Sequence, residues 1–332
     1  MKKTIGLYVF VLSFCVLFAP NALAQTDAQF SQYYEIPTFY NPAAVGSTEY
    51  LRIRGGARLQ WVGIDNAPRS FIGTADMPFK FGNKRVGFGL IANQESAGLY
   101  KSLSIGAQIG YKLRKLGGEW TVALQGGLYD QAFKGSEVFI PDDDDFHQST
   151  DDAIPNTDIH GTAFDAAIGL WYSHKYFNAG LSCTHLTSPT ITMTAENAAG
   201  GSETSGERKY QFQARRTLYF TAGGNIPIKN TLFEIMPSVL VKSDFSFTSG
   251  EINARVRYRK FLSAGIGYRW NDAVVVTLAA EIKNFFIGYS YDYSTSAIHK
   301  ASSGSHELMA GYSLKIDLSE KNRHRHKSVR IM

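Results

Sequence analysis

The feature that most limits how this chain can fold is an alternation of apolar residues with polar or small ones. In one run, apolar side chains at every second position alternate with Ser102, Ser104, Gly106, Gln108, Gly110 and Lys112; they are Leu103, Ile105, Ala107, Ile109, Tyr111 and Leu113. Successive side chains of a β-strand point to opposite faces, so this period indicates strands with one apolar face. Several runs reach roughly 10–12 residues, which suits tilted strands that cross a membrane.

The runs predict about fourteen strands. They cover residues 51–61, 69–78, 85–93, 99–113, 119–132, 162–173, 176–185, 210–223, 231–242, 250–259, 261–270, 273–283, 284–293 and 305–317. An even number of strands is usual for single-chain bacterial outer-membrane barrels. The sequence therefore predicts an all-β fold, a transmembrane antiparallel β-barrel over residues 51–318.

The connections between these strands alternate in length. The even-numbered ones are all short: Phe79–Lys84, Arg114–Gly118, His174-Lys175, Gly224–Asn230, Lys260 and Lys283-Asn284. The longest ones, Phe133–Gly161, Leu186–Lys209 and Ser294–Gly304, are all odd-numbered. Outer-membrane barrels have short periplasmic turns and longer extracellular loops, so both ends of the barrel are expected in the periplasm.

The N-terminus has the pattern of a cleaved signal peptide over residues 1–24. Lys2 and Lys3 precede the apolar run Ile5–Ala19, and Ala22-Leu23-Ala24 supplies small residues before the expected cut. The apolar run is shorter than a membrane-spanning helix usually needs, so a signal peptide is the favoured interpretation. After cleavage Cys183 is the one remaining cysteine, so an internal disulfide is excluded. It falls on the apolar face of its strand, where burial is a better interpretation than a nucleophile.

Two segments flank the predicted barrel. Residues 25–50 are rich in aromatic side chains without a clear period, which predicts either a periplasmic lead or an insert in the lumen. Residues 319–332 form a basic tail, expected in the periplasm, and contribute to the net charge of +5. Such a tail can contact phosphate, lipid headgroups or an acidic partner. Nucleic acid is not an expected partner, because an exported chain without a binding motif offers no recognition element.

Arginines follow two strands on the face opposite the apolar one. They are Arg52, Arg54 and Arg58 in one strand, and Arg255, Arg257 and Arg259 in another. All six are predicted to face the lumen, because a cation on the lipid side costs ~2–4 kcal/mol at the membrane midplane. One interpretation is a channel that attracts anions. The favoured one is an ion-pair network with lumen carboxylates, since charges that face a confined interior are usually paired; the candidates are Asp76, Asp165, Glu281 and Asp292.

No motif in the sequence predicts catalysis, a cofactor or a metal site. The acidic residues within 142–152, in the longest outer loop, could bind Ca²⁺, but they lack EF-hand spacing and a solvated loop is favoured. His324 and His326 alternate with arginines, whose charge opposes a metal ion. A nucleophile elbow, zinc-ligand spacing and a phosphate loop are all missing. The chain is therefore not expected to be an enzyme.

Several motifs together resemble one known family. They are Gln29-Phe30-Ser31-Gln32-Tyr33, Tyr40-Asn41-Pro42-Ala43, Arg58-Leu59-Gln60-Trp61-Val62-Gly63 with Ala67-Pro68, Tyr291-Asp292-Tyr293-Ser294, and Gly304-Ser305-His306-Glu307. This set is similar to the PorP/SprF family of Bacteroidota outer-membrane proteins. The resemblance spans nearly the whole mature chain, and the central loops carry little of it.

The resemblance implies a non-catalytic outer-membrane component of the type IX secretion and gliding machinery, needed for secretion or surface anchoring of adhesin-type cargo. The implied partners are periplasmic ring lipoproteins of that machinery, the C-terminal domain of a secreted adhesin, and outer-membrane lipid. One departure is the basic extension after Leu318, which puts in doubt where the barrel ends.

Two other functions stay open at this stage. The lumen arginines also fit an outer-membrane diffusion channel for small anionic or apolar solutes. The alternating pattern also fits a soluble exported β-sandwich that binds a ligand.

Overall fold

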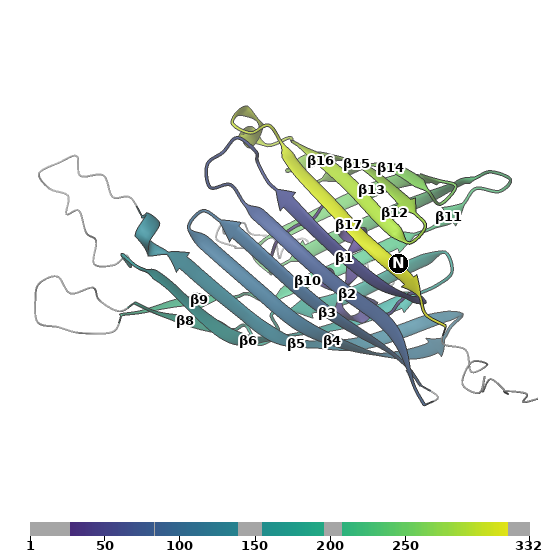
Figure 1. The fold of residues 1–332 in the computed structure, drawn as a ribbon, viewed down its shortest axis with the longest axis horizontal. Coiled ribbons are helices and arrows are strands. Elements are labelled where there is room, and N and C mark those ends of the chain that lie inside the picture. The colour runs from purple at the N-terminus through teal and green to yellow at the C-terminus, as the bar shows by residue number, and fades with distance from the viewer. Residues whose placement is uncertain (1–26, 83, 139–154, 196–207, 318–332) are drawn as a thin grey trace, which may run out of the picture.

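The computed structural model describes residues 27–317 except residues 83, 139–154 and 196–207. These residues form a closed antiparallel β-barrel of 14 strands (Figure 1). Each strand pairs with its neighbours along the barrel; β1 pairs with β17, and β10 pairs with both β7 and β12. The strands are β1 (Tyr50–Leu59), β2 (Arg69–Phe81), β3 (Lys84–Ala97), β4 (Tyr100–Lys115), β5 (Gly118–Lys134), β6 (Asp158–Ser173), β7 (Phe177–Thr184), β10 (Thr217–Gly224), β12 (Phe233–Ser243), β13 (Thr248–Tyr258), β14 (Leu262–Arg269), β15 (Ala273–Ile282), β16 (Phe285–Ser294) and β17 (Ser305–Lys315).

The barrel wall has an apolar outer face and a polar inner face. Ile105, Ile109 and Leu124 point outward and are 53%, 59% and 56% exposed, whereas Gln108 and Thr121 between them are buried in the lumen. A continuous belt of exposed apolar side chains is stable only against lipid. The protein is therefore an outer-membrane barrel, and the soluble sandwich is excluded. None of the helices in the described part of the chain is long and apolar enough to span a membrane.

The two ends of the barrel differ in their connections. Turns at one end are short; for example, Leu116 and Gly117 join β4 to β5 with φ angles of 57° and 76°. Two successive positive φ angles are the geometry of the tight turn that suits the twist of a hairpin. The longer connections lie at the opposite end, including the one that carries η4 (Ala297–Lys300). Since long loops face outward in such barrels, we call this end the outer mouth.

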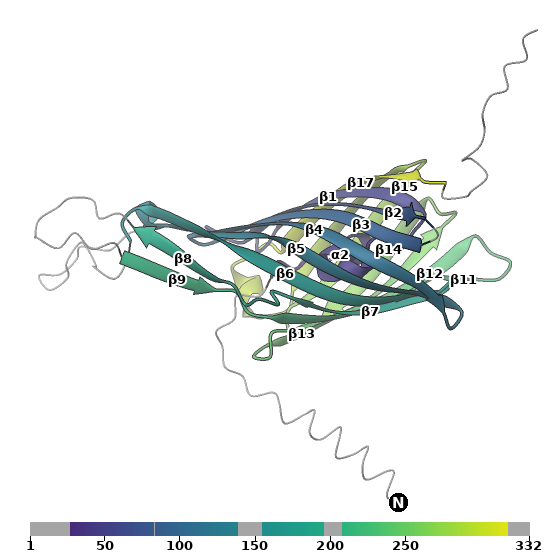
Figure 2. The ribbon, with the colours of Figure 1, turned by 90° about the horizontal axis from the view of Figure 1, so that it is seen from below.

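One predicted strand is wrong. Residues 210–223 do not form a single strand, because β9 (Arg208–Gln213) ends before β10 begins at Thr217. β9 pairs with β8 (Thr190–Ala195) in a separate two-stranded sheet, which lies next to the outer end of β6 (Figure 2). Tyr210 and Phe212 pack there against Ile191 and Met193. The apolar alternation continues across the break, so the period alone does not reveal it. A two-residue strand, β11 (Ile226–Pro227), also pairs antiparallel with the start of β12.

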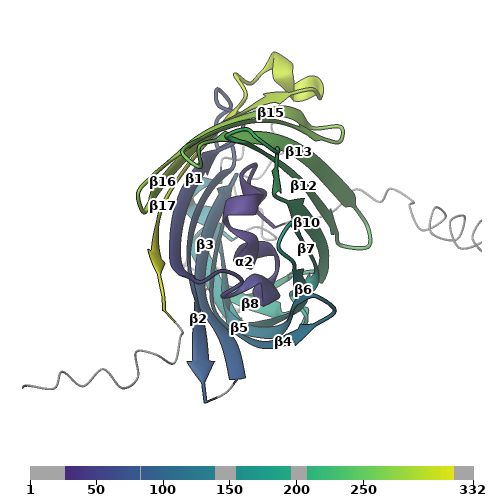
Figure 3. The ribbon, with the colours of Figure 1, turned by 90° about the vertical axis from the view of Figure 1, so that its right-hand side faces the viewer.

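Residues 27–49 lie inside the barrel, and we call them the plug (Figure 3). The plug contains η1 (Tyr33–Glu35), α2 (Pro37–Tyr40) and η2 (Pro42–Ala44). It begins at the outer mouth, where Asp27 contacts residues at the outer ends of β7 and β12. It then descends through the lumen, and β1 begins at the other end.

The wall facing the plug carries glycines where the plug approaches most closely. A Cβ atom on Gly87 would lie 2.3 Å from the backbone oxygen of Val45. Cβ atoms on Gly169 and Gly180 would lie 2.1 Å and 2.5 Å from the side-chain amide of Asn41. That amide donates hydrogen bonds to the backbone oxygens of Leu170 and Leu181. Because no larger residue fits at these positions, the shapes of the plug and the wall are matched.

Candidate functional site

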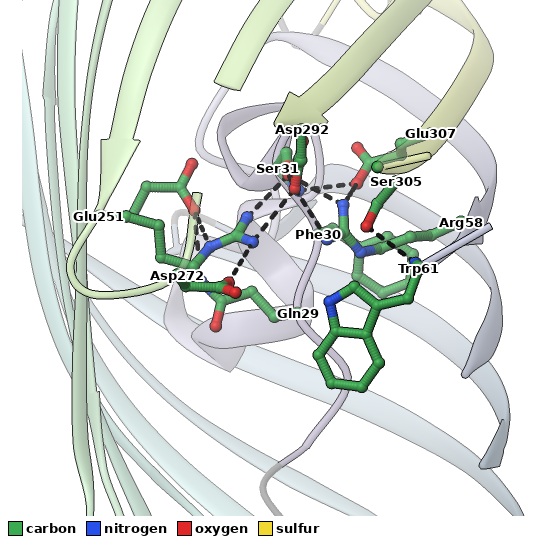
Figure 4. Close-up of polar contacts among 12 residues, drawn as sticks. Gln29, Phe30, Ser31, Arg58, Trp61, Glu251, Asp272, Asp292, Ser305 and Glu307 are labelled. Atoms are coloured by element: carbon green, nitrogen blue, oxygen red, sulfur yellow. Dashed lines mark hydrogen bonds and ion pairs between the residues drawn. The ribbon is translucent and has the colours of Figure 1, made fainter. Parts of the chain in front are cut away.

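A buried network of charges joins five strands, β1, β13, β14, β16 and β17, at the centre of the lumen (Figure 4). Asp292 of β16 pairs with Arg58 of β1 at 2.8 Å and with Arg269 of β14 at 3.1 Å. Arg58 also pairs with Glu307 at 3.4 Å, and Arg269 pairs with Glu251 at 2.8 Å. All five side chains are at most 3% exposed. Each buried charge therefore has an opposite charge beside it, as burial requires.

Ser31 of the plug sits in the middle of this network. Its hydroxyl donates to the Asp292 carboxylate at 2.7 Å and accepts from Arg269 at 2.7 Å and from Arg58 at 3.0 Å. The backbone N–H groups of Ser31 and Gln32 donate to Glu307 at 2.7 Å and 2.9 Å. The plug is therefore bound by charge-assisted hydrogen bonds, which are stronger than neutral ones.

The other lumen arginines also have partners. Glu35 of the plug lies 3.6 Å from Arg54 and 3.5 Å from Arg255. The Arg255 guanidinium also lies 3.1 Å from the ring centroid of Tyr34. Arg52 pairs with Asp76 at 3.1 Å, and the same carboxylate accepts from the backbone N–H of Gly46 in the plug. The ion-pair interpretation of the arginine stripes is therefore confirmed for these residues, with Glu35 as a partner that the sequence pattern did not reveal.

The prediction for the second arginine stripe, Arg255, Arg257 and Arg259, is only partly confirmed. Arg257 pairs with Glu234 and, at 3.7 Å, with the predicted partner Glu281. Arg259 does not face the lumen: it is exposed, has a φ angle of 51° and contacts the ring of Tyr258. The prediction for Arg259 was wrong because β13 ends at Tyr258, so the alternation stops one residue earlier.

A second anchor holds the start of the plug. His185 lies directly after β7, and its two ring nitrogens each lie 2.8 Å from a carboxylate oxygen, one of Asp27 and one of Asp165. Tyr219 donates to Asp27 at 2.6 Å. Burial lowers the pKa of His185, but the two carboxylates outweigh it and raise the pKa to about 10. Burial raises the pKa of Asp27, but the charge and hydrogen bond of His185 outweigh it and hold the pKa below its usual range.

Two kinds of candidate residue remain, the possible metal ligands and Cys183. No group of three or more metal-ligating side chains converges in the part of the chain that the structure describes. The acidic stretch 142–152, for which Ca²⁺ was considered, lies outside the described residues, as do His324, His326 and the basic tail. Cys183 is a free, half-buried thiol on β7, beside the outward-facing Leu181 in the alternation of that strand.

The outer mouth holds a cavity of about 1010 Å³ above the plug. Its floor includes Asp27 and Gln29 of the plug together with Arg58 and Arg269. One wall is polar and comes from β3, β4 and β5, with Asn93, Glu95, Ser102, Gln125 and Gln131. Aromatic side chains add to the lining, namely Trp61, Tyr100, Phe247 and Trp270. Sequence analysis missed this cavity, because isolated amides and hydroxyls on strands form no motif.

Comparisons with known proteins identify one family. The family described as "Type IX secretion system membrane protein PorP/SprF" matches residues 22–312. No curated protein matches the chain.

Several solved structures resemble the fold. The toluene transporter TbuX of Ralstonia pickettii is 11% identical, with a TM-score of 0.48 over 84% of this chain and 93% of that one. The CymD monoaromatic hydrocarbon channel is 10% identical, with a TM-score of 0.46 over 89% and 95%. A Pseudomonas aeruginosa FadL homologue is 9% identical, with a TM-score of 0.45 over 84% and 94%.

The buried network predicts a large effect for the loss of one arginine. Arg269→Met leaves Glu251 and Asp292 with fewer partners, so the free energy of unfolding should fall by about 3–5 kcal/mol. Thermal or denaturant unfolding of the detergent-solubilised protein measures it. Arg259→Met is the matched control; its exposed side chain should cost less than about 1 kcal/mol. Equal effects of the two substitutions would contradict the role of the network.

The His185 anchor predicts a dependence of stability on pH. The raised pKa of His185 stabilises the fold fully below pH 6.5, its ordinary pKa, and this contribution is lost as the pH rises through about 10. The lowered pKa of Asp27 stabilises the fold above its ordinary pKa of 3.8 and is lost on acidification. His185→Gln should therefore be less stable than the wild type at pH 7, by on the order of a few kcal/mol, and the gap should shrink above pH 10. Thermal unfolding across pH 5–11 tests this, and a constant gap would exclude it.

Proposed function

This chain belongs to the PorP/SprF family of type IX secretion system membrane proteins, and we propose that it is a plugged, non-catalytic scaffold of that system in the outer membrane. It would be needed for the secretion or surface anchoring of adhesin-type cargo. The family match over residues 22–312 supports the assignment to the system. The finer role rests on how the lumen is filled.

The observation that carries the scaffold role is the bonding of the plug to the wall. Ser31 binds Arg58, Arg269 and Asp292 at once, and all of these groups are buried. If the plug moved aside, Arg54 and Arg255 would lose the carboxylate of Glu35, and a buried charge without a partner costs several kcal/mol. Asp292 and Glu307 would also lose their hydrogen bonds from the plug. The lumen is therefore better suited to hold the wall rigid than to conduct a solute.

The plugged lumen leaves the two ends of the barrel as contact surfaces. The outer mouth carries the cavity and the longer loops, and it would contact the C-terminal domain of a secreted adhesin. The opposite end carries short turns and would contact the periplasmic ring lipoproteins of the machinery. Both partners are those that the family implies.

A diffusion channel for small anionic or apolar solutes is the competing function. The lumen arginines were the reason to consider it. In the structure Arg52, Arg58 and Arg255 are all paired with carboxylates, so their charge is not available to attract anions. This pairing favours the scaffold over the channel.

Deletion of the gene tests the proposed role. We expect cells without the protein to lose surface display of the dependent adhesin, because no other chain would hold the cargo at the outer mouth. Antibody labelling of intact cells measures the display, and re-expression of the wild-type chain is the control. Normal display in the deletion strain would refute the proposal.

Planar-bilayer conductance of the purified protein separates the two functions. The scaffold predicts a silent barrel, and a variant without residues 27–44 should conduct because its lumen is emptied. A large steady conductance of the wild type would favour the channel instead.

A further inference from the structure

Two residues on the lumen face of β3 carry hydrogen-bond acceptors and line the cavity of the outer mouth. Asn93 and Glu95 are two positions apart on the lumen face, about 7 Å along the strand. Asn93 is only 8% exposed, and its Oδ1 atom has no hydrogen-bond partner. Among the residues that the structure describes, the Glu95 carboxylate forms no hydrogen bond or ion pair. We call this pair the acceptor wall.

Within the described part of the chain, Glu95 differs from carboxylates elsewhere in the lumen in having no ion-pair partner. Asp76, Asp292 and Glu307 each accept from an arginine and from the plug. The Lys242 ammonium donates to the backbone oxygen of Asp27 at 3.2 Å, and among the described residues no ion pair joins it to Glu95. A polar atom that is buried without a partner is rare in folded proteins and costs stability. The Glu95 carboxylate is therefore available to a donor that enters the cavity.

The chemistry of the missing donor follows from the two acceptors. An amide oxygen and a carboxylate require N–H groups, and the carboxylate favours a positive charge. A guanidinium carries five N–H donors in a planar fork and can serve two acceptors, whereas an ammonium is a compact point charge. Trp61, Tyr100 and Trp270 line the same cavity and offer ring faces that attract cations.

We infer that the acceptor wall binds an arginine side chain of a polypeptide that enters the outer mouth. This inference rests on the proposed function, because the cargo is the polypeptide that would supply the arginine. The Asn93 oxygen and the Glu95 carboxylate accept from the guanidinium, and the aromatic side chains of the cavity cover its flat faces.

Peptide binding to the full-length protein in detergent tests the inference. The probe is the blocked tripeptide acetyl-Gly-Arg-Gly-amide, and calorimetry measures its affinity. The same peptide with citrulline, a neutral analogue of arginine, in place of arginine is the control for charge. The same peptide with lysine is the control for the planar geometry of the guanidinium. We expect the arginine peptide to bind most tightly and the citrulline peptide least. Equal affinity of the arginine and citrulline peptides would overturn the inference.

Two substitutions locate the binding. Glu95→Gln should weaken binding of the arginine peptide by about tenfold or more, because it removes a charged hydrogen bond. Glu137→Gln is the matched control, since Glu137 is exposed and pairs with Lys134 outside the cavity. Asn93→Asp adds a second carboxylate and should tighten binding. This gain cannot result from misfolding, so unchanged or weaker binding by Asn93→Asp would also overturn the inference.

A cell experiment separates this inference from the proposed function. If display of the adhesin depends on the protein but is unchanged by Glu95→Gln, the acceptor wall is not where the cargo binds and the inference fails alone. If deletion leaves display intact while the peptide binds as expected, the proposed function fails and the arginine site stands. Loss of display in both strains supports both.

Discussion

The structure depends on the pairing of charges that are removed from water inside the barrel. Arg58 and Arg269 have almost no exposed surface and share the carboxylate of Asp292. A buried guanidinium without a carboxylate would be very costly, so these residues must meet in the folded state. They belong to β1, β14 and β16, so their pairing requires that distant parts of the wall come together. Ser31 binds at their meeting point, which ties the position of the plug to the closure of the barrel.

The plug also supplies the apolar core that a membrane barrel lacks. The wall turns its large apolar side chains toward lipid, so packing inside must come from elsewhere. Phe30, Ile36 and Tyr40 of the plug are fully or almost fully buried, and the ring of Tyr40 packs edge-on against Tyr219 of β10 at 5.4 Å. Gly87 and Gly169 give the plug room to approach the backbone of the wall. The polar network and the aromatic packing thus act on the same segment.

The sequence predicts the wall better than the lumen, for a physical reason. Alternation is a local property, and it locates most strands because each has one apolar face. It does not distinguish a strand that turns away from the wall, so β9 and β10 were merged, and it does not mark the strand end that leaves Arg259 outside. The contacts of the plug are nonlocal: Ser31 meets Glu307 across 276 residues, and Glu35 meets Arg255 without any shared pattern. Arginines on the lumen face could be predicted to have partners, but the sequence could not show that the plug provides some of them.

The two sides of the lumen differ in how their charged groups are paired, and this difference bears on the proposed function. On the side formed by β1 and β13–β17, arginines and carboxylates are paired with one another and with the plug. On the side formed by β3–β5, the outer part of the wall faces the cavity, and among the described residues no ion pair involves Glu95. At this height Asp27, the first described residue of the plug, is bound by His185 and Tyr219. Under the proposed function, a barrel that is closed through its middle and has an unpaired carboxylate at its outer mouth would hold a polypeptide there rather than pass a solute.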